Sequence, residues 1–67
     1  MPRLWSQSYA DTITIARLYR TAGQYHDAAI EFVWAAEVAP SEGEETAMLT
    51  DAFFCLTLAA RQWEDEA

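Results

Sequence analysis

At 67 residues and a net charge of −7, the chain is one domain at most, and its acidity disfavours direct binding to nucleic acid or to an anionic membrane. It also lies below the roughly 70–80 residues at which one core gives comfortable stability, so a disulfide, a metal or a partner is expected to support it. Cys55 has no second cysteine to pair with, and His26 has no second histidine or cysteine nearby. Self-association or binding to another protein therefore remains as the expected support for the fold. A basic protein surface is the natural partner for so acidic a chain.

A first helix is predicted over about residues 7–22. Ser6 or Ser8 can act as its N-cap, Asp11 lies in its first turns, and Gly23 suits the left-handed conformation that ends many helices. Two apolar stripes follow helical spacing, which implies two neighbours. The main stripe is Ile15, Leu18, Tyr19 and Ala22, and the weaker one is Tyr9, Ile13 and Ala16.

A second helix is predicted over about residues 24–39. Pro40 stops it, because the residue before a proline is pushed out of the helical region. Its widest face consists mainly of small residues, which let another helix approach closely. The residues of this face are Tyr25, Ala28, Ala29, Phe32, Ala35, Ala36 and Ala39.

A third helix is predicted over about residues 42–63, with fraying in the last four residues of the chain. Ser41 can cap it while Glu44 reaches back to the Ser41 amide, the arrangement called a capping box. Between Ala52 and Ala60 this helix is apolar nearly all round, so it is either central in the fold or covered by a second chain. No segment favours a strand over a helix. We therefore expect a single all-α domain of three helices over residues 1–67.

Several residues of the second predicted helix follow the spacing of a known motif. These residues are Gly23, Tyr25, Ala28, Phe32, Ala35 and Pro40. The spacing resembles the second helix of a tetratricopeptide repeat, a 34-residue pair of antiparallel helices that stacks into superhelices and serves protein binding. In the same alignment Ile15, Ala16 and Tyr19 match the first helix of that family, whereas Thr12 stands where a tryptophan is usual.

The resemblance covers about residues 9–42 and implies an antiparallel helical hairpin. Leu49 and Phe53 fit the start of a second repeat, but Trp63 comes about one turn late for its continuation. A repeat array needs about three units, so the resemblance implies a hairpin with a third helix laid against it and no solenoid. A small-residue hairpin unrelated to the family is the alternative.

Ile30 and Trp34 occupy positions that the family usually keeps polar. They are four residues apart, so they lie on one side of the helix and form a second apolar stripe, and tryptophan is a frequent interface anchor. Alternatively, the third helix or the N-terminal Leu4 and Trp5 cover this stripe within the chain. The candidate partner-binding residues are Ile30, Val33, Trp34, Val38, Phe54, Leu58 and Trp63.

The sequence offers no set of catalytic or cofactor-binding residues, so we do not expect an enzyme. Asp27 points about 100° away from His26 around the helix, and Cys55 has no cation or histidine in helical reach to lower its pKa. The acidic residues after Pro40 lack the pattern of a calcium loop. The first twelve residues lack the apolar run of a secretory signal, and no apolar stretch is long enough to span a bilayer. A cytoplasmic protein is therefore expected.

Three functional hypotheses remain. The first is a small helical interaction module that self-associates, forming a homo-oligomer, or docks on a larger protein. The second is a small acidic inhibitor, of the kind that viruses of bacteria encode, which imitates nucleic acid to block a basic groove of a host enzyme. Its charge fits, but six of the eleven acidic residues lie in two helix-terminal clusters, where capping and solvation explain them. The third is a subunit of a larger helical assembly.

Overall fold

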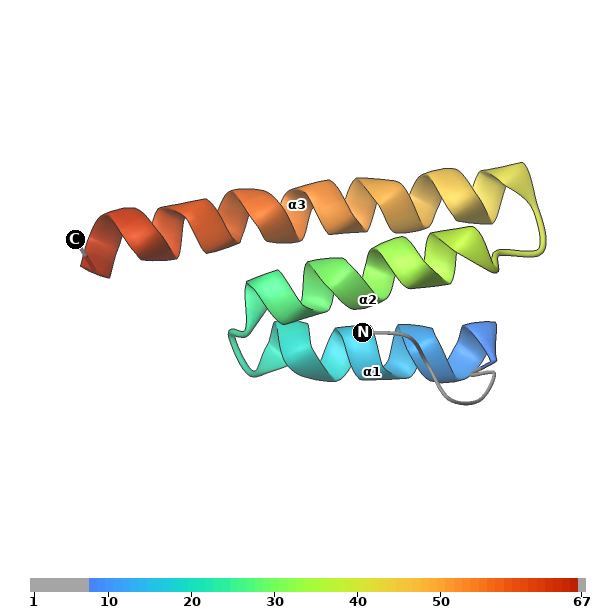
Figure 1. The fold of residues 1–67 in the computed structure, drawn as a ribbon, viewed down its shortest axis with the longest axis horizontal. Coiled ribbons are helices and arrows are strands. Elements are labelled where there is room, and N and C mark those ends of the chain that lie inside the picture. The colour runs from blue at the N-terminus through green and yellow to red at the C-terminus, as the bar shows by residue number, and fades with distance from the viewer. Residues whose placement is uncertain (1–7, 67) are drawn as a thin grey trace.

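The computed structural model describes residues 8–66, with the side chains of residues 8–64. Three helices follow one another along the chain: α1 (Tyr9–Thr21), α2 (Tyr25–Glu37) and α3 (Glu42–Glu66). They lie antiparallel to their neighbours in one layer, with α2 between α1 and α3 (Figure 1). The expected all-α fold is confirmed, and the described residues contain no strand. Against the prediction, α3 does not end near residue 63 but continues to Glu66.

Both ends of α1 have the signals that the sequence suggests. The Ser8 hydroxyl accepts a hydrogen bond from the Asp11 amide at 3.1 Å, which satisfies one of the free N–H groups of the first turn. At the other end Gly23 has φ +79°, and the Gln24 amide donates to the Tyr19 carbonyl at 2.9 Å. This bond and the one from Gly23 to Arg20 form a Schellman motif, so the chain turns directly into α2.

The start of α3 is capped as expected, although one hydrogen bond differs. The Glu44 amide donates to the Ser41 hydroxyl at 3.2 Å. The Glu44 carboxylate does not serve the Ser41 amide as predicted. It accepts from the Ser41 hydroxyl at 3.5 Å, and it lies near enough to the Tyr9 phenol to raise the pKa of that phenol. Because Tyr9 opens α1, the first turn of α1 lies near the first turn of α3.

The core is built on α2, on the small-residue face that the sequence predicts. Phe32 is fully buried, and the Arg20 guanidinium lies over its ring at 5.5 Å from the centroid. Alanines around Phe32 allow close approach of the flanking helices. The buried apolar residues are Ala16, Ala28, Ala29, Phe32, Ala35, Ala36, Met48, Ala52 and Cys55.

The rotation of α1 differs from the prediction. Leu18, expected in the main stripe, is 66% exposed, whereas Ala16 of the weaker stripe is fully buried. Thr12 is buried as well. Its hydroxyl donates to the Ser8 carbonyl at 3.0 Å, so the buried hydroxyl has a hydrogen-bond partner. The physical reason is that α1 packs mainly along α2, and its smallest residues meet the alanine face of α2.

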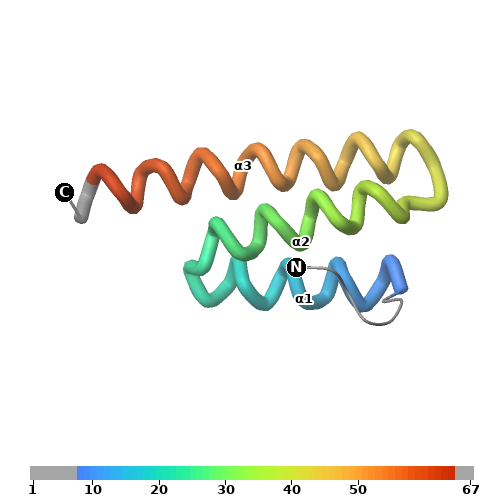
Figure 2. The backbone as a smooth tube through the Cα atoms, in the orientation of Figure 1, coloured from blue at the N-terminus to red at the C-terminus, as the bar shows by residue number. Residues whose placement is uncertain are grey.

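α3 is not central, because α2 occupies that place. α3 has 25 residues and α2 has 13, which correspond to lengths of about 37 and 20 Å at 1.5 Å per residue. The backbone trace shows α3 continuing past the start of α2 (Figure 2). One face of α3 packs on α2, and the apolar residues on its other faces are left uncovered in the described part of the chain.

Candidate interaction surface

The stripe of α3 that faces α2 repeats at intervals of four and three residues. We call it the inner seam, and it consists of Met48, Ala52, Cys55, Ala59 and Gln62. Met48, Ala52 and Cys55 are buried in the core. At the far end the Gln62 amide donates to the Gly23 carbonyl at 2.9 Å. This bond and the three buried residues of the inner seam fix the rotation of α3 about its own axis.

A second stripe runs beside the inner seam, shifted by one residue and so turned by about 100° around the helix. We call it the outer seam, and it consists of Leu49, Phe53, Leu56, Ala60 and Trp63. All five residues are exposed, with Phe53 at 71% and Trp63 at 79%. Spacings of four and three are those of the apolar seam of a coiled coil. α3 therefore presents to solvent the residue pattern that another helix would bury.

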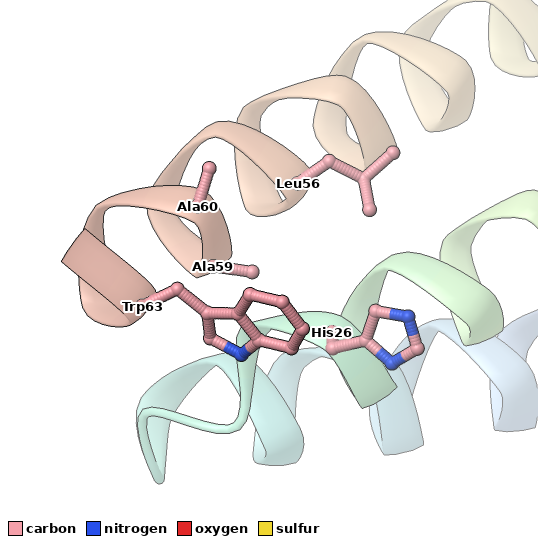
Figure 3. A pocket seen from close by; sticks show the side chains of 5 residues that line it. All are labelled: His26, Leu56, Ala59, Ala60 and Trp63. Atoms are coloured by element: carbon pink, nitrogen blue, oxygen red, sulfur yellow. The ribbon is translucent and has the colours of Figure 1, made fainter. Parts of the chain in front are cut away.

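A pocket of about 380 Å³ opens at the C-terminal part of α3, lined by His26, Leu56, Ala59, Ala60 and Trp63. Figure 3 shows the Trp63 indole reaching from α3 toward the His26 ring on α2. The four α3 residues stand at positions i, i+3, i+4 and i+7. Four residues of this kind form the hole that accepts one side chain of a facing helix in knobs-into-holes packing.

One flank of α2 extends this surface. Ile30 and Val33 follow His26 by four and seven residues, so they lie on the same side of α2 as the residue that lines the pocket. Ile30 is 40% exposed and Val33 is 37% exposed. We call His26, Ile30 and Val33 the α2 flank. With the outer seam it forms one apolar surface over two antiparallel helices.

The rim of the outer seam is uncharged. On the side away from α2 it carries Thr50 and Thr57, whose hydroxyls donate to carbonyls of their own helix at 2.9 and 3.1 Å. Asp51 is the only charged residue between positions 46 and 60, and it lies about 160° around the helix from Phe53. The other charged residues of α3 are Glu42, Glu44 and Glu45 in its first turn, and Arg61, Glu64, Asp65 and Glu66 toward its C-terminus. A partner of the outer seam therefore meets apolar groups and methyls.

The candidate residues from the sequence do not all share one face. Ile30, Val33 and Trp63 belong to the surface just described. Phe54, which is 62% exposed, and the half-buried Leu58 lie on a different flank of α3. The remaining two candidates, Trp34 and Val38, lie at the C-terminal end of α2. Trp34 is half-buried and has an interaction partner, and Val38 is exposed. Leu4 and Trp5, the alternative cover for the Trp34 stripe, lie outside the described residues.

Sequence reasoning missed Leu49, Phe53, Leu56 and Ala60. The signal was present as the repeat of four and three residues along α3. It was obscured because the inner seam has the same repeat one residue earlier, so the helix reads as apolar all round. Only the packing on α2 shows which of the two repeats is covered.

The described residues contain no group of three or more histidine, cysteine, aspartate or glutamate side chains that could hold a metal ion. Cys55 is an unpaired, buried thiol, and burial raises its pKa, so it is held in the protonated form that is a poor nucleophile. None of the helices within residues 8–66 combines the length and the apolar character that a bilayer crossing requires.

Comparison with protein-family models, with curated proteins and with solved structures found no match. The outer seam and the α2 flank therefore have to be interpreted from their own geometry and chemistry.

Proposed function

We propose that this chain is a non-enzymatic protein interaction module that acts by burying the outer seam and the α2 flank against another helix. The observation that carries the proposal is the exposure of Phe53 and Trp63 within a coiled-coil spacing. A soluble chain gains free energy by covering such a surface, at about 25 cal/mol for each Å² of apolar area removed from water. Aromatic anchors in a central patch contribute most of the binding energy in typical interfaces.

The proposal does not depend on the resemblance to tetratricopeptide repeats. That resemblance covers residues 9–42, whereas the outer seam lies on α3. The α1–α2 hairpin serves in this proposal as the support that fixes the rotation of α3. A cytoplasmic location belongs to the proposal too, because the unpaired Cys55 suits a reducing compartment.

The alternative function, an acidic inhibitor that imitates nucleic acid, draws on the net charge of −7. It requires acidic groups in a row that a basic groove can follow. In the middle of α3 Asp51 is the one acidic residue, and it lies about 160° around the helix from Phe53, whereas the other acidic residues of α3 gather near its two ends. The interaction module is therefore the better supported of the two functions.

Phe53 and Phe54 provide a matched pair for a test. They are adjacent, similarly exposed, and point about 100° apart, so Phe53→Glu places a charge in the outer seam while Phe54→Glu places it outside. The purified variants should fold alike, as judged by circular dichroism. Binding to self or to a protein captured from the native cell extract should be lost in Phe53→Glu and kept in Phe54→Glu. If neither variant changes any binding that the wild type shows, the proposed surface is wrong.

A further inference from the structure

We propose that the partner of the outer seam is a second copy of this chain, paired through antiparallel α3 helices. This inference rests on the proposed function and names its partner. Three properties of the described surface lead to a second copy: the order of large and small residues along the seam, the hole at Trp63, and the distribution of charge.

The outer seam is complementary to itself when it is reversed. With a two-fold axis midway between Phe54 and Cys55, Phe53 of one copy lies opposite Leu56 of the other. Leu49 then lies opposite Ala60. Each such pair occurs twice, so large side chains meet smaller ones along the whole contact, as an isologous interface requires. A shift of one heptad that places Leu49 opposite Phe53 leaves two such contacts instead of four. A shift in the other direction keeps four but places Phe53 opposite Trp63, so that two large side chains meet.

In the same alignment, a side chain of the second copy fills the pocket. Ala60 is one wall of the hole between Leu56 and Trp63, and the side chain opposite it is Leu49 of the second copy. A leucine is the residue most suited to such a hole in coiled-coil packing. Trp63 then lies opposite Thr46 of the second copy, an uncharged residue that leaves room for the indole.

The helix dipoles favour this arrangement over a parallel pair, which would align the two dipoles unfavourably. The acidic clusters do not distinguish the two directions, because the antiparallel pair brings Glu42, Glu44 and Glu45 of one copy to the end where Glu64 of the other copy lies. A basic partner protein would find no carboxylate along the middle of the outer seam. In the antiparallel pair, the contact from Thr46 to Ala60 contains no charged seam or rim residue, so a chain of net charge −7 can approach its own copy there.

The exposed area is sufficient for a dimer. The two aromatic residues and four aliphatic residues of the outer seam and α2 flank expose on the order of 600 Å² per chain, given that a whole aromatic side chain presents about 150–250 Å². Complete burial of this area on both copies would cover about 1,200 Å², which is the lower limit for stable protein interfaces. The contributing residues are Phe53, Trp63, Leu49, Leu56, Ile30 and Val33.

Sedimentation equilibrium of the purified full chain gives the first test. Wild type and Phe54→Glu should be dimers at micromolar concentration, and Phe53→Glu should dissociate at least about tenfold more readily, since a charge buried in the contact costs well over 1.4 kcal/mol. Circular dichroism of each variant shows whether the helices are retained. Equal dissociation constants for Phe53→Glu and Phe54→Glu would overturn the assignment of the interface.

Cross-linking tests the direction of the helices. In the antiparallel pair Thr50 of one copy lies beside Thr57 of the other. Along the helix axis Thr50 is offset from its own equivalent by about 13 Å and Thr57 by about 8 Å, at 1.5 Å per residue. In a Cys55→Ala background, chains with Thr50→Cys mixed with chains with Thr57→Cys should form a mixed disulfide under mild oxidation. Each variant alone should form little. A dimer without the mixed cross-link contradicts the antiparallel arrangement.

The outcomes separate this inference from the proposed function. If the wild type remains a monomer but a different protein binds in a manner that Phe53→Glu abolishes, the interaction module stands and the second copy is wrong. If the wild type is a monomer and Phe53→Glu affects no binding, both proposals are wrong.

Discussion

Phe32 lies at the middle of α2, fully buried among alanines that bring α1 and α3 close to its ring. Its truncation to alanine should cost about 3–5 kcal/mol, because it removes the largest core side chain and leaves a cavity. A loss of this size is comparable to the whole stability of so small a domain. Urea unfolding followed by circular dichroism should therefore show no cooperative transition for Phe32→Ala.

Leu18→Ala is the control for this prediction. Leu18 is large, apolar and mostly exposed on α1, so its truncation should change the unfolding free energy by less than about 0.5 kcal/mol. If Leu18→Ala destabilised the protein as much as Phe32→Ala, the rotation of α1 in the structure would be wrong.

The raised pKa values of the Cys55 thiol and the Tyr9 phenol should make the unfolding free energy fall at high pH. Burial raises the pKa of the Cys55 thiol, and burial with the nearby Glu44 carboxylate raises the pKa of the Tyr9 phenol. In each case the folded state binds the proton more tightly than the unfolded state does. The stabilisation is complete below the ordinary pKa, about 8.5 for cysteine and 10 for tyrosine, and is lost as the pH rises through the raised value.

Urea midpoints measured from pH 7 to pH 11, at intervals of about half a unit, test this dependence. The midpoint should decline above about pH 9. Cys55→Ala should remove the earlier part of the decline and leave the part due to Tyr9. A profile of identical shape for the wild type and Cys55→Ala would show that the thiol does not contribute.

At the level of the helices, the cap of α3 depends on Ser41. The bond from the Glu44 amide to the Ser41 hydroxyl satisfies a free N–H group, so Ser41→Ala should lower the unfolding free energy by about 0.5–2 kcal/mol. Ser41→Asn keeps a side-chain acceptor and should lose much less. Denaturant unfolding of the two variants measures the difference, and equal losses would mean that the cap contributes nothing specific.

The helices and their ends could be predicted from sequence because local chemistry determines them. Ser8, Gly23 and Ser41 act at the predicted places, and the small face of α2 is the one that is buried. The rotation of α1 could not be predicted, since two stripes compete and only packing decides between them. The outer seam was difficult for the same reason, because Phe53 and Ala52 belong to two overlapping repeats that differ only in which one meets α2.

For the molecule as a whole, three helices in one layer cannot enclose all of their apolar residues. Within residues 8–66, α2 has a helix on each side, but α3 has α2 on one side only (Figure 1). The long α3 therefore keeps the outer seam exposed although its inner seam is covered. A second copy placed on α3 would give it the missing neighbour and would provide the support that a chain of 67 residues usually needs.

Salt should strengthen this self-association. Two chains of net charge −7 repel each other, and screening reduces that repulsion while leaving apolar contacts in place. A complex between this acidic chain and a basic groove would respond in the opposite direction, since salt weakens attraction between opposite charges. The sign of the salt effect therefore distinguishes the two functional classes.

Sedimentation equilibrium of the wild-type chain, from about 1 to 100 µM in roughly 0.05 and 0.5 M salt, tests the central claim most directly. Burial of the outer seam between two copies predicts a mass that rises with concentration from the chain's 7.6 kDa toward twice that value. It also predicts tighter association at the higher salt concentration. A mass of 7.6 kDa throughout, at both salt concentrations, would contradict it.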